Sequence, residues 1–193
     1  MIGRDAPGDR RQAGKPPRKA TRQSLENAAL HYLERFAASA DALRRVLMRR
    51  VERSAQAHDT DRAEGAAMVD AILERFRQSG LLNDAVYAEG RTATLHRRGA
   101  SARGIRRQLA AKGVDRDTVE AAIARLAEEA PDPDFAAAIA YARRRRLGPW
   151  RGGDRATRRD RDLAALARQG FSYDVARRVI DAPSPEALEN VED

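Results

Sequence analysis

Residues 82–113, LNDAVYAEGRTATLHRRGASARGIRRQLAAKG, decide the fold that this sequence predicts. The stretch contains two helices together with their start and stop signals. Asn83 and Asp84 supply side-chain oxygens for the free N–H groups at the start of the first helix. Gly99 closes that helix, because glycine adopts the left-handed backbone conformation of a helix end at low cost. We therefore expect a helix over residues 84–98.

The second helix of the stretch, over residues 102–112, has one apolar face and one basic face. Ser101 is placed to cap its start, and Gly113 stops it. Ile105 and Leu109 lie four residues apart and so share one face. The remaining surface carries little acid, which favours contact with an acidic partner or with phosphates over a merely solvated face. These candidate binding residues are Arg103, Arg106, Arg107 and Lys112.

Apolar stripes at helical spacing continue the pattern on both sides of this stretch. In the first unit Ser24 and Ser39 are the expected caps of two helices, and a polar linker is expected over residues 53–62. The third unit begins with Asp132 as cap and Pro133 at the first helical position, a favoured arrangement. We expect three units of three helices each, over residues 24–80, 81–130 and 131–182.

The second and third units repeat each other at a constant offset of 57 residues. The offset holds for a leucine, a glycine stop and an isoleucine, which are Leu109 with Leu166, Gly113 with Gly170, and Ile123 with Ile180. A repeat of this length is typical of stacked supersecondary units that are each too small to bury an apolar face alone. We therefore predict an all-α protein in which three tandem three-helix repeats form an elongated, curved array.

Composition and charge agree with small helical units and two tails. Charged residues make up 34% of the chain and aromatic residues only 5%, which suits stacked small units better than one large core. Residues 1–23 carry seven basic and two acidic groups, and so +5 of the net charge of +8. They lack apolar anchors, so we expect a disordered basic tail there. Residues 183–193 are expected to form an acidic C-terminal tail.

The sequence offers little for an enzyme or a metal site. It has no cysteine, and its three histidines, His31, His58 and His96, are scattered. No phosphate-binding glycine loop is present, and paired carboxylates lie at helix ends, where capping explains them. We therefore expect no catalytic residue, metal or cofactor. Because no run resembles a signal peptide or could cross a bilayer, we expect a cytoplasmic protein without membrane contact.

A second basic cluster lies in the third unit. A run of four arginines ends the unit's first helix, and more arginines follow a Gly-rich loop expected over residues 151–157. Two interpretations of this run are equally supported: a solvated helix face, or a contact with phosphates or an acidic protein surface. Four consecutive arginines cover every side of a helix, so some of them must face away from any partner. Trp150 could stack on a base, although packing is the more common fate of tryptophan. The candidate binding residues are Arg143, Arg144, Arg145, Arg146, Arg158 and Arg159.

Order and spacing of several motifs resemble the RecX family, bacterial regulators of the RecA recombinase. The pattern DxxYA over residues 84–88, followed by IRxxLxxKG over residues 105–113, resembles the family's middle repeat. The pattern LxxLxxQGF over residues 163–171 resembles its third repeat. The first repeat departs from the family, because Arg50 and Val51 stand where a Lys-Gly stop is usual. The resemblance covers roughly residues 24–181.

The resemblance implies a non-enzymatic modulator, mainly negative, that binds RecA or its nucleoprotein filament. Such proteins suppress strand exchange, ATP hydrolysis and coprotease activity, and so regulate homologous recombination, DNA repair and the SOS response. We expect RecA and its filament on DNA as the partner, with direct DNA contact a further option, and a monomer. The alternative is a DNA-binding helical-repeat protein that acts without RecA. A scaffold whose charges only solubilise it is a third option, for which charge reversal would change nothing.

Overall fold

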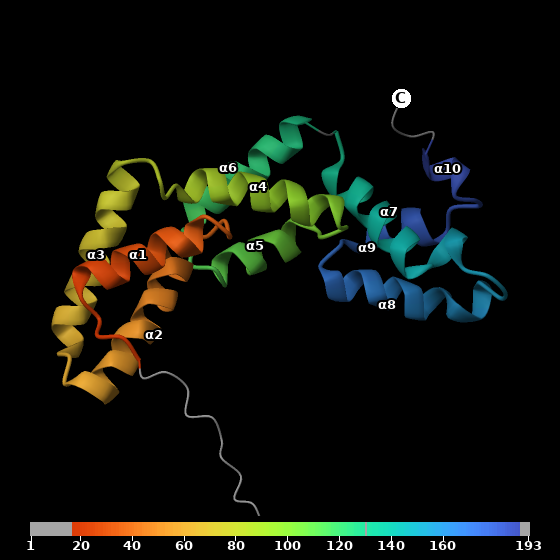
Figure 1. Cartoon of the computed structure of the whole chain (residues 1–193). Coiled ribbons are helices and arrows are strands. Elements are labelled where there is room, and N and C mark those ends of the chain that lie inside the picture. Colours follow the sequence, from red (N-terminus) through yellow and green to blue (C-terminus); the bar gives the residue numbers. More distant parts are fainter. Residues whose placement is uncertain (1–16, 130, 190–193) are drawn as a thin grey trace, which may run out of the picture.

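The computed structural model describes residues 17–129 and 131–189, and this part of the chain contains helices and no strand. The helices form an arch of three successive units (Figure 1). The first unit consists of α1 (Arg22–Leu33), α2 (Ala40–His58) and α3 (Arg62–Gln78), and the second of α4 (Asp84–Arg97), α5 (Ala102–Ala110) and α6 (Arg116–Glu129). The third comprises α7 (Pro133–Arg145), η1 (Gly148–Trp150), η2 (Ala156–Arg158), α8 (Arg159–Gln169), α9 (Tyr173–Ile180) and α10 (Glu186–Glu189).

Each unit of the arch has its own buried apolar cluster. Leu47 and Val69 are among the buried residues of the first cluster, Ile105 lies in the second, and Leu166 and Val179 lie in the third. The second helices α2, α5 and α8 follow the inner side of the arch (Figure 1). The predicted fold class, three tandem three-helix repeats in an elongated, curved array, is therefore confirmed.

The 57-residue repeat is visible as repeated backbone geometry. Gly113 and Gly170 both have positive φ, 75° and 97°, at the ends of α5 and α8. In both units, a side chain just after this glycine then caps an N–H group in the first turn of the third helix. The N–H of Thr118 donates to Asp115 at 2.9 Å, and that of Val175 donates to Ser172 at 3.2 Å. The repeated residues thus fix where the second helix stops and where the third begins.

The start of the first unit differs from the sequence-based expectation. Thr21, and not Ser24, is the N-cap of α1, because Ser24 lies at the third helical position and returns the bond in a capping box. Residues 17–23, expected to be disordered, are part of the fold. The Ala20 N–H donates to the Ser54 hydroxyl at 2.8 Å, and Ala20 is buried. Residues 1–16 of the expected tail lie outside the described residues.

The linker expected over residues 53–62 is mostly helix. With Arg50 and Val51 in place of a glycine stop, α2 continues to His58 and ends at Asp59, whose φ is +52°. The extra turns are held by packing, because Val51 is buried against Gly65 of α3: a Cβ added to Gly65 would lie 2.4 Å from Val51 Cγ1. The departure from the repeat pattern therefore lengthens one helix.

The loop expected over residues 151–157 and the tail expected over residues 183–193 are both more ordered than predicted. Within residues 151–157, the Arg155 guanidinium donates to the carbonyls of Ile180 and Ala182 at 3.0 and 2.7 Å and so caps the end of α9. The segment after residue 182 includes α10, and Leu188 is buried in the third cluster. The expected acidic tail is thus partly folded, and residues 190–193 lie outside the described part.

Two equivalent junctions join the units. At the first, the Ser39 hydroxyl donates to the Lys112 carbonyl at 2.5 Å, and the Ala40 N–H donates to Asp84 at 2.7 Å. At the second, four residues repeat this arrangement: Ser101 donates to the Gln169 carbonyl, and the Ala102 N–H donates to Asp134, both at 2.7 Å. In each case the cap serine of one unit's second helix binds the end of the next unit's second helix.

Glycines allow this close approach. A Cβ added to Gly113 would lie 2.4 Å from Asp41 Cβ of the first unit, and a Cβ added to Gly170 would lie 3.1 Å from Arg103 Cβ of the second. At Gly99, whose φ is +76°, an added Cβ would lie 2.6 Å from the Tyr141 backbone nitrogen of α7. The curvature of the array therefore depends on positions without a side chain.

Candidate partner-binding surface

The basic face of α5 divides into paired and unpaired arginines. Arg106 forms a bidentate pair with Glu120 of α6, with Nε–Oε1 and Nη2–Oε2 distances of 2.8 Å. The hydrogen bond from Arg106 holds the pKa of the Glu120 carboxyl below its usual range. Arg103, Arg107 and Lys112 are exposed and make no side-chain hydrogen bond or ion pair with any residue that the structure describes. These three side chains are therefore available to a partner, whereas Arg106 holds α5 to α6.

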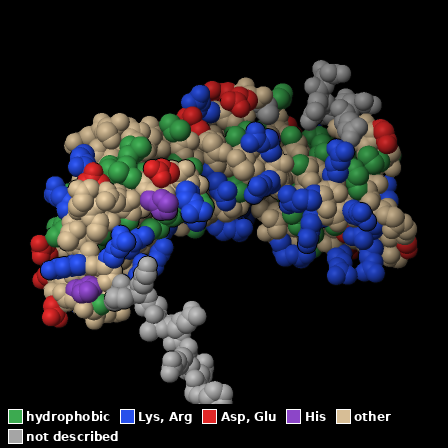
Figure 2. Space-filling view, viewed as in Figure 1, with side chains coloured by type: hydrophobic (Ala, Val, Ile, Leu, Met, Phe, Trp, Pro, Cys, Tyr) green, Lys and Arg blue, Asp and Glu red, His purple; other side chains and the backbone are tan. Residues whose placement is uncertain are grey.

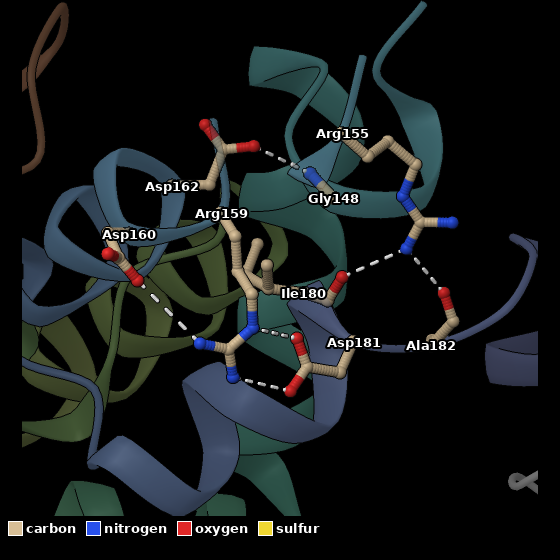
Figure 3. A network of polar contacts seen from close by, with 8 residues as sticks. All are labelled: Gly148, Arg155, Arg159, Asp160, Asp162, Ile180, Asp181 and Ala182. Atoms are coloured by element: carbon tan, nitrogen blue, oxygen red, sulfur yellow. Dashed lines mark hydrogen bonds and ion pairs between the residues drawn. The ribbon is translucent and has the colours of Figure 1, made fainter. Parts of the chain in front are cut away.

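Arg159, a second candidate from the sequence, is also an internal group. Its guanidinium binds Asp181 with two contacts of 2.7 Å and so ties the start of α8 to the end of α9 (Figure 3). The hydrogen bond from Arg159 lowers the pKa of Asp181. Arg158, its exposed neighbour, makes no such contact within the described residues. The geometry assigns Arg159 a structural role.

The arginine run at the end of α7 is distributed over several surroundings. Arg144 donates to the Arg98 carbonyl at the end of α4, and its guanidinium lies 5.7 Å from the Tyr141 ring centroid, so it links the second and third units. Arg146 adopts the left-handed conformation with φ of +54° and ends the helix. All four side chains of the run, Arg143 to Arg146, are exposed.

A cleft lined by arginines lies between the end of α7 and α8. It has a volume of about 500 Å³, and its charged lining comprises Arg144, Arg145, Arg146, Arg151, Arg161, Arg168 and Asp162. We call it the arginine cleft. With six guanidinium groups and one carboxylate, its walls carry a formal charge of +5. Such a concave surface concentrates positive potential and favours phosphate or carboxylate groups of a partner.

Asp162 is the carboxylate that holds the cleft together. It is buried and accepts bonds from Arg151 at 2.5 and 3.0 Å. It also accepts a bond from the Gly148 N–H at 3.0 Å (Figure 3). Burial alone would raise the pKa of Asp162, but the bonds from Arg151 and Gly148 outweigh it, and the pKa lies below its usual range. Asp162 is therefore ionised and fully engaged at neutral pH, and it leaves the other cleft arginines unneutralised.

The second junction brings the α5 face next to the arginine cleft. Gln169, whose carbonyl accepts the bond from Ser101, lines the cleft, and its neighbour Gly170 packs against Arg103. Lys and Arg side chains gather along the lower edge of the arch beneath α5 and α8, where few acidic side chains are visible (Figure 2). Arg103 and the cleft thus form one basic surface, although they are far apart in the sequence.

Three members of this surface are absent from the sequence-based candidates: Arg151, which is paired with Asp162, and two arginines of α8, Arg161 and Arg168. Both are exposed on α8 and line the cleft with Ala165 between them. Their spacing of i, i+4 and i+7 places all three on one helix face, a signal that the sequence contains. Arg107, on α5, and Lys112, in the turn after it, are exposed and do not line the cleft.

Other chemistry receives no support from the described residues. Among them, no group of three His, Cys, Asp or Glu residues is arranged to hold a metal ion. Trp150 packs against the apolar cluster of the third unit. The structure therefore supports a packing role for Trp150 and not base stacking. No helix within residues 17–129 and 131–189 combines the length and apolar character needed to cross a membrane.

The fold and the surface define an all-α helical-repeat protein with an arginine-rich inner edge. Residues 83–123 match the family model described as "RecX, second three-helix domain". The chain is 44% identical to regulatory protein RecX of Myxococcus xanthus over 93% of its own length and 96% of the relative's. It is 36% identical to regulatory protein RecX of Thermobifida fusca over 62% of its own length and 69% of the relative's. This chain therefore belongs to the RecX family of regulatory proteins.

A solved structure agrees with the fold. The crystal structure of RecX from Lactobacillus salivarius superimposes with a TM-score of 0.59 over 88% of this chain and 97% of that one. The two sequences are 20% identical, so the likeness concerns the fold alone.

Proposed function

We propose that this protein is a non-catalytic modulator of RecA that binds the RecA nucleoprotein filament and suppresses ATP hydrolysis, strand exchange and coprotease activity. Membership of the RecX family supports the regulatory role. The observation that carries the proposal is the joint basic surface of Arg103 and the arginine cleft. Its guanidinium groups point away from the three cores and are suited to acidic protein side chains or to phosphates.

The shape of the molecule supports a polymeric partner. An arch of three units offers several separated contacts along one edge (Figure 1). Contacts made by linked units reinforce one another, because the first raises the effective concentration of the others. Binding across neighbouring RecA subunits would hold them in one state and so reduce the rate of ATP turnover.

The direct test is the DNA-dependent ATPase of RecA with substoichiometric amounts of this protein. We expect the rate to fall. A rate that stays unchanged while RecA filaments are shown to be intact would refute the proposal.

The cleft is tested with a matched pair of variants. The double variant Arg145→Glu, Arg168→Glu reverses two exposed cleft arginines whose side chains form no hydrogen bond or ion pair with a described residue. The control, Arg97→Glu with Arg116→Glu, makes the same charge change on α4 and α6, outside the cleft, at two exposed arginines whose side chains form no hydrogen bond or ion pair with a described residue. We expect the cleft variant to lose at least about tenfold in inhibitory potency, which corresponds to about 1.4 kcal/mol. Equal losses for the two variants would mean that only net charge matters.

The alternative function, DNA binding without RecA, is also favoured by the charge of the cleft. It predicts DNA affinity that falls steeply with salt whether or not RecA is present. For single strands, removing two phosphate contacts would flatten the dependence of log K on log salt by about 1.4. If the cleft variant loses DNA affinity but inhibits RecA normally, the alternative is favoured for this surface.

A further inference from the structure

Exposed apolar side chains are concentrated in one groove that the basic surface does not include. Five large apolar side chains of the described residues are exposed, namely Leu30, Phe36, Leu81, Val86 and Tyr173. The first four line the same groove of about 940 Å³ between the first and second units. Contiguous exposed apolar surface on a small protein marks an interaction site more often than scattered apolar residues do.

The groove is built where the first two units meet. One wall comes from the end of α1 and the loop after it, with Phe36 exposed by 52%, and the other from the start of α4, with Val86 exposed by 64%. The half-buried rings of Tyr32 and Tyr87 lie between these walls, and the Tyr32 and Phe36 ring centroids are 5.2 Å apart. Hydrophobic side chains are visible on this face where α1 lies beside α3 and α4 (Figure 2).

The charges around the groove are mainly positive. Arg91 and Lys112 line it together with one acidic residue, Glu34. The Arg35 guanidinium lies 5.8 Å from the Phe36 ring centroid, at the edge of the same wall. An occupant that complements this groove therefore presents apolar side chains flanked by carboxylates.

The segments of this chain outside the described residues do not have that character. Residues 1–16 carry four basic and two acidic groups, and their large apolar side chains are Met1 and Ile2 alone. Residues 190–193 offer a single valine and follow Leu188, which is buried in the third unit at the other end of the arch. Like charges would also face each other if two grooves of the same kind packed together about a two-fold axis.

We propose that this groove is a docking site for an apolar segment with acidic flanks on the recombinase, separate from the basic inner surface. The inference rests on the proposed function, because RecA is the partner named there. Apolar burial at the groove would supply affinity that salt does not weaken, whereas the arginine surface supplies the salt-dependent part. The two surfaces together would fix the orientation of the arch on the filament.

The test compares two exposed apolar sites with one matched site elsewhere. The groove variant is Phe36→Ser with Val86→Ser, and the control is Tyr173→Ser, because Tyr173 is exposed by 63% and lies at the start of α9. Affinity for preformed RecA filaments and inhibition of the RecA ATPase are measured at low and high salt, and thermal unfolding verifies that each variant is folded. Arg91→Glu is a second groove variant that leaves the apolar side chains intact.

We expect the groove variant to lose at least about tenfold in affinity at both salt concentrations, and the control to behave like the wild type. Arg91→Glu should lose affinity mainly at low salt, and DNA binding without RecA should be unaffected in all three variants. If the wild type inhibits RecA and the groove variant inhibits equally well, the groove proposal fails and the proposed function stands. If the wild type has no effect on RecA, both fail. Concentration-dependent dimerisation that the groove variant abolishes would assign the groove to a second copy and overturn the proposal.

Discussion

The contact between the second and third units can be tested at a single glycine. Gly99 ends α4 in a left-handed conformation, with its N–H donating to the His96 carbonyl at 2.7 Å. Gly80 has nearly the same φ, +74° against +76°, at the end of α3. A Cβ at Gly80 would meet nothing within 4 Å, whereas a Cβ at Gly99 would lie 2.6 Å and 2.8 Å from the backbone nitrogen and Cα of Tyr141. Gly80→Ala is therefore a matched control for Gly99→Ala.

The expected cost differs between the two variants. Both pay about 1–2 kcal/mol for an L side chain in the left-handed region. At Gly99 the backbone of α7 must also retreat, and overpacking of this kind adds about 1–3 kcal/mol. We expect Gly80→Ala to lower the free energy of unfolding by about 1–2 kcal/mol and Gly99→Ala by about 2–5 kcal/mol.

Urea unfolding of the two variants measures this difference. Hydrogen exchange should in addition show faster exchange in α7 of the Gly99→Ala variant, since its contact with α4 is loosened. Equal destabilisation by the two substitutions would refute the argument that close backbone contact at Gly99 sets the position of the third unit.

Two further predictions concern the junction and the cleft. Ser101→Ala should lower the free energy of unfolding by about 1–3 kcal/mol, because it removes a helix cap and a bond between units. Ser172→Ala removes only a helix cap and should lower it by about 1 kcal/mol. Urea unfolding measures both changes. The pKa of Asp162 is about 3.9 in the unfolded chain and lower in the folded protein. Ionised Asp162 therefore stabilises the fold fully above the unfolded pKa, and this stabilisation is lost as the pH falls through the folded pKa. Asp162→Asn should therefore unfold at lower temperature at pH 7 and show a smaller loss of stability than the wild type on acidification, and parallel pH profiles would contradict this role.

Local signals made the fold predictable from the sequence. Gly113 and Gly170 stop helices, and Asp115 and Ser172 cap the next ones, so periodicity and punctuation agree at the same positions in two units. Where the glycine is missing, at Val51, the polar composition of residues 53–62 predicts a linker, but α2 continues to His58. Packing of α2 against α3 decided for a longer helix, and propensity alone could not show it.

The junctions were not predictable, because their bonds join residues far apart in the sequence. The sequence predicts Ser101 as a cap, but the second bond of Ser101, to the Gln169 carbonyl, depends on how the second and third units pack. The same holds for Asp134, which lies in the first turn of α7 and also accepts the bond from the Ala102 N–H. A serine at a helix start thus has a local role that the sequence predicts and a long-range role that it does not.

The candidate site was predicted by residue type and corrected by pairing. Arg106 and Arg159 are chemically equivalent to Arg103 and Arg145, yet the first two have carboxylate partners on a neighbouring helix and the second two have none among the described residues. The described residues carry 33 Lys and Arg and 25 Asp and Glu, a net charge of +8, but this total alone does not explain why the basic surface lies on one edge of the arch. It arises because packing places carboxylates such as Asp162 in internal bonds, which leaves the remaining guanidinium groups together on one edge of the arch. A variant that released those carboxylates from their internal bonds would weaken the basic surface without changing the net charge. The positions of the internal ion pairs, and not the overall charge, therefore decide what this protein can bind.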